Sequence, residues 1–146
     1  MAPDLGGVTR ARALASRIGT EMAIIDKRRP KANVAEIMTI LGDIEGKTCI
    51  MLDDMIDTGG TITKGAQALL DRGAKAVIAA CTHPVFSGKA YENLENSVLQ
   101  EVIVTNTINI PKDKLLDKIT VLSVAPLFAR AIERIHNDQS ISVLFE

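Results

Sequence analysis

The segment Ile50–Thr63, IMLDDMIDTGGTIT, joins an apolar run to three carboxylates and then to two glycines flanked by threonines. Acidic side chains this close repel one another and cost free energy unless a cation or a hydrogen-bond donor lies among them. A glycine-rich turn that leads into a helix offers backbone N–H groups to an anion. The stretch therefore predicts a strand–loop–helix unit whose ligand presents hydroxyls or a metal at one end and a phosphate at the other.

The order of residues in this segment suggests how the parts are used. The apolar run delivers Asp53 and Asp54 to the carboxyl end of a strand, where ligands bind in open α/β sheets. Gly59 and Gly60 are expected to permit positive φ and close approach of the backbone to a ligand. The hydroxyls that follow Asp57 are expected to bond phosphate oxygens; they belong to Thr58, Thr61 and Thr63. The alternative is a solvated turn whose side chains only cap the helix, but one such residue suffices for a cap.

Length and composition limit the remaining possibilities. The 146 residues predict a single domain, 1–146, and with 47% hydrophobic but only 3% aromatic residues its core must be aliphatic. A net charge of −1 gives no global field toward nucleic acid or an anionic membrane. With neither a long apolar run nor a signal-peptide pattern, we expect a cytoplasmic protein. Cys49 and Cys81 lie in apolar runs and are expected to be core thiols rather than a disulfide.

Strand and helix patterns alternate along the chain, which predicts an α/β domain with a largely parallel central sheet flanked by helices. Helices are expected at Val8–Ile18, Thr61–Arg72, Gly88–Asn96 and Pro126–His136. Strands are expected at Glu21–Asp26, Ala35–Leu41, Lys47–Leu52, Ala76–Thr82, Glu101–Thr107 and Ile119–Val124, with a strand-like tail, SISVLFE. The last helix is expected to bury one apolar stripe, made of Leu127, Phe128, Ala131, Ile132 and Ile135.

The first residues have a functional-looking loop, APDLGG, without a strand before it. Such loops in a parallel sheet normally follow the carboxyl end of a strand. We therefore expect this chain to be the second half of something longer.

Several of these motifs resemble known proteins. DDMIDTGGT resembles the binding loop of the type I phosphoribosyltransferase fold, which holds ribose 5-phosphate or phosphoribosyl pyrophosphate. A nearly continuous series of segments is similar to the carboxyl-terminal half of the ribose-phosphate pyrophosphokinase family; these are APDLGGVTRARALA, AIIDKRRP, NVAEIM, IEGKT, CTHPVFSG and VTNTI. The resemblance implies Mg²⁺-dependent transfer of diphosphate from ATP to the 1-hydroxyl of ribose 5-phosphate, for nucleotide biosynthesis. The products are phosphoribosyl pyrophosphate and AMP, and this half alone is expected to be inactive.

The resemblance also assigns residues to the sugar phosphate. It implies that the 5-phosphate is cradled by Asp57, Thr58, Gly59, Gly60 and Thr61. The preceding pair, Asp53 and Asp54, would face the ribose hydroxyls and the metal-bound substrate, with Asp53 the stronger sugar ligand.

For ATP and the metal, the resemblance points to two other segments. In the family a mobile loop closes over the ATP phosphates, which here implies Lys27 as a catalytic point charge and Arg29 as a clamp on phosphate or the transferred group. Asp4 would be the Mg²⁺ ligand. By residue type alone, Lys27 and Arg29 would belong to a solvated loop and Asp4 to a turn.

The resemblance implies assembly and regulation as well. Family members form homo-oligomers, from dimers to hexamers, and many respond to phosphate and ADP at an anion site between subunits. Ser140, Ser142 and Phe145 match the tail's contribution to that site, and two serines two apart on an extended strand would face the same way. By residue type alone, the tail is a strand that covers the sheet edge.

Two alternatives stay open. A stand-alone type I phosphoribosyltransferase would need a hood for base recognition, and no aromatic-bearing segment offers one. A non-catalytic regulatory subunit of the synthase would typically have a degraded catalytic loop, whereas Lys27, Arg29 and the acidic pair are present.

Overall fold

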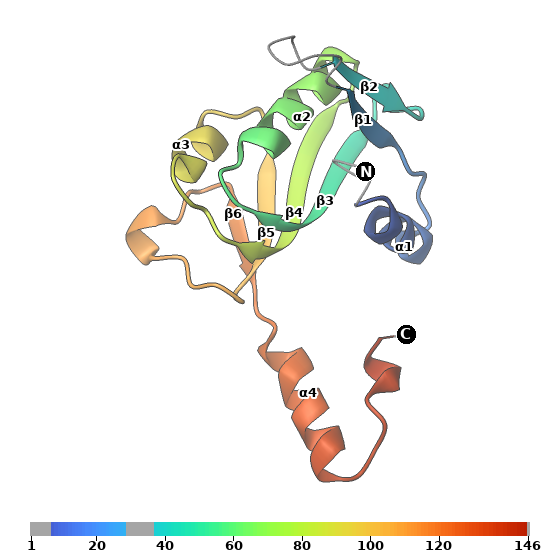
Figure 1. Ribbon diagram of the computed structural model, residues 1–146, viewed down its shortest axis with the longest axis vertical. Coiled ribbons are helices and arrows are strands. Elements are labelled where there is room, and N and C mark those ends of the chain that lie inside the picture. Colours follow the sequence, from blue (N-terminus) through green and yellow to red (C-terminus); the bar gives the residue numbers. More distant parts are fainter. Residues whose placement is uncertain (1–6, 29–36, 146) are drawn as a thin grey trace.

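The computed structural model describes residues 7–28 and 37–145. Its centre is a parallel sheet in the order β3-β4-β5-β6 (Figure 1), and the predicted α/β class is confirmed. The strands are β3 (Thr48–Ile56), β4 (Ala76–Pro84), β5 (Glu101–Thr105) and β6 (Ile119–Leu122). The helices are α1 (Val8–Ile18), α2 (Gly60–Asp71), α3 (Ala90–Glu95) and α4 (Ala125–His136), with short 3₁₀ helices η1 (Lys112–Lys114) and η2 (Ser142–Leu144).

One face of the sheet is buried, because the strands place aliphatic side chains under α2. Every second residue is buried in the first half of β3, in β4 as far as Cys81, and throughout β5. Met51, Val77 and Val102 are fully buried at the centre of this aliphatic core. Cys49 and Cys81 are buried free thiols, as predicted, and burial raises the pKa of Cys81 to about 11.

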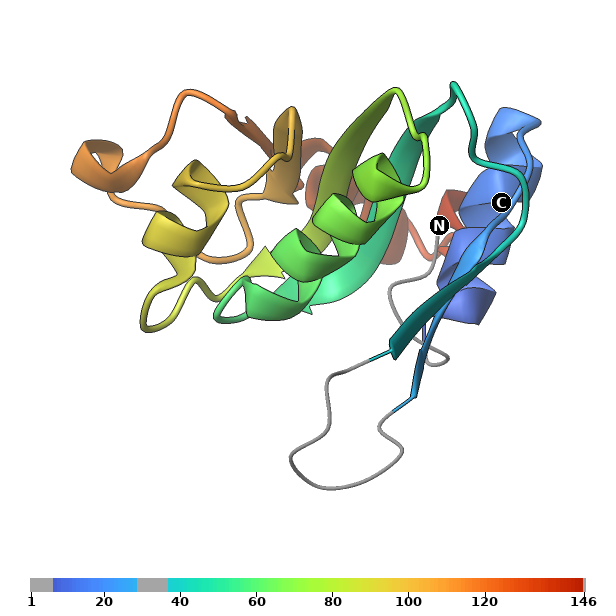
Figure 2. The same cartoon turned by 90° about the horizontal axis from the view of Figure 1, so that it is seen from above.

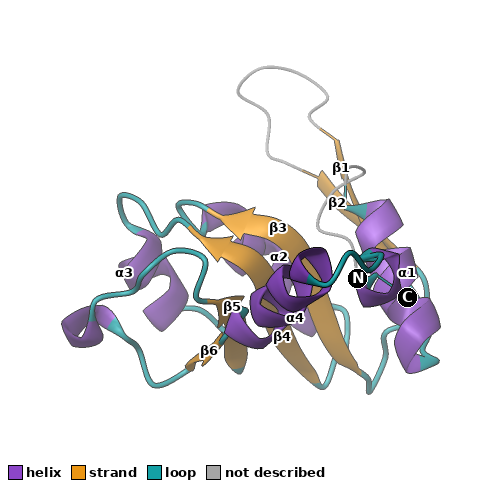
Figure 3. Ribbon diagram, turned by 90° about the horizontal axis from the view of Figure 1, so that it is seen from below, coloured by secondary structure: helices purple, strands orange, loops and turns teal. Residues whose placement is uncertain are grey.

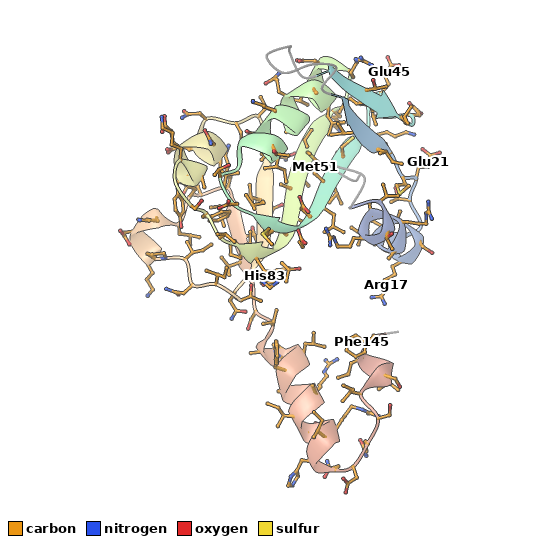
Figure 4. The ribbon with its side chains drawn as sticks, in the orientation of Figure 1. Arg17, Glu21, Glu45, Met51, His83 and Phe145 are labelled. Carbon is orange, nitrogen blue, oxygen red and sulfur yellow. The ribbon has the colours of Figure 1, made fainter. Side chains whose placement is uncertain are left out.

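Helix α2 packs across β3 and β4 and covers the buried face of the sheet (Figure 2). Its inward face consists of Ile62, Ala66 and Leu69, which are all buried. Gly65 allows the close approach, because a Cβ there would lie 2.7 Å from Cε of Met51. Met51 lies on β3, the edge strand of the parallel sheet that is next to this helix (Figure 4).

A second, two-stranded sheet stands at the side of the domain (Figure 2). It consists of β1 (Ile24–Arg28) and β2 (Ile37–Leu41), paired antiparallel. The sequence interpretation ended the first strand at Asp26 and began a loop at Lys27, which is wrong, because β1 continues through Arg28. The fully buried Ile25 connects this sheet to the core.

The carboxyl-terminal part departs most from expectation. Helix α4 extends away from the sheet along the long axis of the molecule (Figure 1), so its predicted burial is wrong. In the view along this axis α4 overlaps the sheet (Figure 3). Phe128, Ile132 and Ile135 are 60–66% exposed, and α4 has no buried residue. The tail folds back as η2 and not as a strand. It and α4 enclose an apolar pocket of about 180 Å³, lined by Leu127, Phe128, Ala131, Ile141, Leu144 and Phe145.

Across the described residues, no helix combines the length and apolar character that crossing a membrane requires.

Candidate functional site

The acid–glycine segment forms a cavity of about 240 Å³ at the carboxyl end of β3. The cavity is lined by Asp53, Met55, Ile56, Asp57, Thr58, Gly59, Thr61 and Ile62. The predicted strand end at Leu52 is wrong, because pairing with β4 continues to Ile56. Both carboxylates of the acidic pair therefore project from a hydrogen-bonded strand, which fixes their backbone more firmly than a loop would.

Arg10 of α1 joins the acidic pair from outside the segment. Its Nη2 lies 3.3 Å from Oδ1 of Asp53, and its Nη1 lies 3.4 Å from Oδ2 of Asp54. A hydrogen bond with the Asp53 side chain lowers the pKa of Asp54, and the charge of Arg10 lowers it further. One guanidinium thus faces two carboxylates, which leaves this end of the cavity with acceptor capacity for hydroxyls or a hard cation.

The amino end of α2 supplies the other half of the cavity. Its N-cap is Gly59, at φ +75°, and no side chain makes a cap hydrogen bond. The helix-capping alternative is therefore wrong, and the first backbone N–H groups of α2 lack intrahelical partners. Their direction and the helix dipole suit an anion such as phosphate.

Two details of this loop correct the sequence interpretation. Gly60 begins the helix without positive φ, so only Gly59 needs the left-handed conformation. A Cβ on Gly60 would meet nothing nearer than Oγ1 of Thr58, at 3.9 Å. The Thr63 hydroxyl donates to the Gly59 carbonyl at 3.0 Å, so this proton is directed to the helix backbone and not to the cavity.

The neighbouring segment after β4 holds the same loop. The Ser87 hydroxyl donates to Oδ1 of Asp57, and Nδ2 of Asn93 donates to the Thr58 carbonyl at 2.8 Å. The sequence interpretation missed Ser87, Asn93 and Arg10. Ser87 had a usable signal, because parallel neighbours end at the same edge of a sheet and the loop after β4 must lie beside the loop after β3.

The predicted site residues differ in what the structure says about them. Asp53, Asp57, Thr58, Gly59 and Thr61 line one cavity, while Asp54 and Gly60 flank it without lining it. The backbone of Lys27 lies in β1, but the position of its side chain is outside the described part, as are Arg29 and Asp4. Within the described ranges no three His, Cys, Asp or Glu residues group as metal ligands.

The predicted effector residues lie on the tail. The Ser140 and Ser142 hydroxyls are 2.8 Å apart, so they do converge, although through a turn and not through an extended strand. Nη2 of Arg17, on α1, donates to the Phe145 carbonyl at 2.8 Å (Figure 4). The tail is thus attached to the body, and its regulatory role remains a prediction.

Comparison with known proteins gives consistent matches. Residues 17–146 match the model of the phosphoribosyl synthetase-associated domain. The ribose-phosphate pyrophosphokinases of Clostridium tetani and Bacillus subtilis are 62% and 57% identical over 100% and 99% of this chain. In each case the match covers 46% of the relative, so the chain spans just under half their length.

A solved structure matches as well. The crystal structure of phosphoribosylpyrophosphate synthetase from Mycobacterium smegmatis aligns with a TM-score of 0.85 and 43% identity. The alignment covers 94% of this chain and 44% of that one.

Proposed function

We propose that this chain, which belongs to the phosphoribosyl synthetase-associated domain family, is the sugar-phosphate-binding part of a ribose-phosphate pyrophosphokinase. The observation that carries the proposal is the cavity between the end of β3 and the amino end of α2. It offers carboxylate acceptors at one end and uncapped N–H donors at the other. Ribose 5-phosphate has the matching polarity, with vicinal hydroxyls at one end and a phosphate at the other.

In the proposed reaction the 1-hydroxyl of ribose 5-phosphate attacks the β-phosphorus of ATP. The diphosphoryl group moves to the sugar oxygen, AMP leaves, and the hydroxyl proton is lost. Such a step depends on positioning and on neutralising charge. Asp53, held in place by Arg10, would accept from the ribose 2- and 3-hydroxyls with Asp54 beside it. Asp57, Thr58, Gly59, Gly60 and Thr61 would bind the 5-phosphate through backbone and hydroxyl donors.

In this proposal the transferred diphosphoryl group is bound by cationic side chains that do not line the cavity. Lys27, at the end of β1, would stabilise charge on the phosphates in the transition state, and Arg29 would clamp them. Asp4 and the acidic pair supply carboxylate oxygens, the donor type that Mg²⁺ prefers, and the ion would neutralise phosphate charge when bound. A cytoplasmic location, homo-oligomers and phosphate or ADP as effectors at Ser140, Ser142 and Phe145 belong to the same proposal.

The isolated chain tests the sugar site directly. We expect weak binding of ribose 5-phosphate by calorimetry and no phosphoribosyl pyrophosphate from added ATP, because the chain covers only 46% of such enzymes. Asp53→Asn should reduce the affinity about tenfold, since an amide accepts hydroxyl hydrogen bonds less well than a carboxylate. Asp117→Asn, an exposed acid remote from the cavity, is the control. AMP formation that depends on ribose 5-phosphate would contradict the expected inactivity.

The catalytic assignment needs a full-length enzyme containing this half. There Lys27→Ala should lower turnover by several orders of magnitude with little effect on sugar affinity, since the interaction is made chiefly in the transition state. Near-normal turnover would remove Lys27 from the catalytic machinery.

A further inference from the structure

We propose that Ser87 is a positioning residue that holds Asp57 in its binding orientation, an inference that rests on the proposed sugar-phosphate function. The Ser87 backbone N–H donates to the Asp57 carbonyl at 3.1 Å, and the Ser87 hydroxyl donates to Oδ1 of the same residue. Backbone and side chain of Asp57 are therefore both fixed by one residue. Because Oδ1 is held by Ser87, Oδ2 is the oxygen left to receive a ligand donor.

The chain reaches this position through an uncommon backbone conformation. Phe86, directly before Ser87, has φ +46°, a left-handed value that bulky residues rarely adopt. Its N–H donates to the Ile56 carbonyl at 3.1 Å, and the residue is 6% exposed. The ring packs edge-to-face on Tyr91 with centroids 5.4 Å apart. Burial of the ring offsets the strained φ, and the result is a turn that places Ser87 opposite Asp57.

The rest of the loop between β3 and α2 is held from the same side. Asn93 bonds the Thr58 carbonyl at 2.8 Å. Around Gly59, an added Cβ would meet the Ala90 carbonyl and the Leu94 side chain, both at 3.6 Å. Each loop residue from 57 to 59 thus lies against the turn after β4 or against α3. Preorganisation of this kind lowers the cost of ordering a binding loop around its ligand.

The test compares Ser87→Ala with Ser87→Thr in the isolated chain. Ser87 is exposed, so the extra methyl of threonine has room while the hydroxyl is retained. Calorimetry should show that Ser87→Ala lowers ribose 5-phosphate affinity about tenfold and that Ser87→Thr stays within about twofold of the parent. Ser97→Ala is the matched control, because its hydroxyl bonds the Leu94 carbonyl at 2.6 Å at the far end of α3. Ser97→Ala should lower the melting temperature without changing the affinity.

A second measurement separates this inference from the proposed function. NMR should show that the Asp57 carboxyl resonance moves in Ser87→Ala and returns in Ser87→Thr, with or without ligand. If the parent chain does not bind ribose 5-phosphate but the Asp57 signal responds in this way, the proposed function fails and the positioning role survives. An Asp57 signal indifferent to Ser87→Ala, or equal ribose 5-phosphate affinity in Ser87→Ala and a binding parent, would overturn the role of Ser87.

Discussion

Helices α2 and α4 each have 12 residues and an apolar stripe, yet their surroundings are opposite. On α2 the stripe faces the parallel sheet, and Ile62 and Leu69 are no more than 4% exposed. On α4 the stripe has no sheet to cover it: one part lines the pocket against the tail, and Ile132 and Ile135 are 66% and 63% exposed. A period of 3.6 residues thus identifies which face of a helix is apolar, but not what covers that face. The loop that lines the cavity precedes α2, the helix whose apolar face is covered by the parallel sheet.

The largest expected effect is a difference in the free energy of unfolding between one leucine-to-alanine substitution in α2 and one in α4. Leu69→Ala should lower the free energy of unfolding by about 3 kcal/mol, because it leaves a cavity under α2. Leu127→Ala on α4 should cost less than about 1 kcal/mol, since this side chain is 48% exposed. Urea unfolding of both variants provides the measurement.

Equal losses would break the comparison. They would mean that the apolar face of α4 is covered in solution, and sedimentation of the parent chain would then be expected to show association.

A smaller effect distinguishes folding from binding within the α2 region. Gly59→Ala should destabilise the chain by about 1 kcal/mol, because alanine is strained at φ +75°. Gly60→Ala should change stability by less than about 0.5 kcal/mol, since a Cβ there would be only in ordinary contact with Oγ1 of Thr58, at 3.9 Å. The same methyl sits beside Thr58 at the helix N–H groups and should reduce ribose 5-phosphate affinity about tenfold.

Thermal unfolding and calorimetry on both variants check this pair. If Gly60→Ala binds like the parent, the phosphate is not held at the amino end of α2.

The sequence alone predicts those parts of the candidate site whose residues are neighbours in the chain. The cavity-lining residues from Asp53 to Thr61 fall in one short segment, so their type and spacing are enough to predict that they lie together, and the ligand of the cavity stays a prediction. Arg10, Ser87 and Asn93 lie 43, 30 and 35 residues from their partners, and no local pattern marks them. These residues reach the cavity loop or the acidic pair through the pairing of β3 with β4 and through the packing of α1.

The errors in the fold have physical causes too. The end of β3 was placed too early because aspartate disfavours strands, but pairing of Ile56 with Pro84 overrides that preference. The tail was expected to be a strand from its alternating residues, but backbone bonds such as Phe145 N–H to the Ser142 carbonyl fold it into a turn. Strand pairing decided the first case, and local backbone hydrogen bonds decided the second.

Arg10 tests how far the acidic pair depends on its neighbours. A hydrogen bond with Asp53 and the charge of Arg10 both lower the pKa of Asp54, so Arg10→Met should raise that pKa. A lowered pKa in the folded state stabilises the fold above the ordinary value of 3.8, and this contribution is lost as the pH falls below it. The variant should therefore show a weaker loss of stability on acidification. NMR titration of Asp54 measures the shift, and an unchanged pKa in Arg10→Met would mean that the guanidinium does not act on this carboxyl.

The smallest expected effect lies in the α4 region, at the tail. The Ser140 and Ser142 hydroxyls bond each other on an exposed turn, and Nε of Arg134 already donates to the Ser140 carbonyl at 2.5 Å. Changing both serines to alanine should leave the unfolding free energy of the isolated chain within about 0.5 kcal/mol of the parent, because exposed hydroxyls contribute little. Ribose 5-phosphate affinity should not change, since the cavity between β3 and α2 has no residue in common with the tail.

In a full-length enzyme the same double variant should weaken phosphate activation and ADP inhibition, because two converging hydroxyl donors would be removed from the proposed anion site. Unaltered ADP inhibition would leave the tail with its structural role only, attached to α1 through Arg17 and the Phe145 carbonyl.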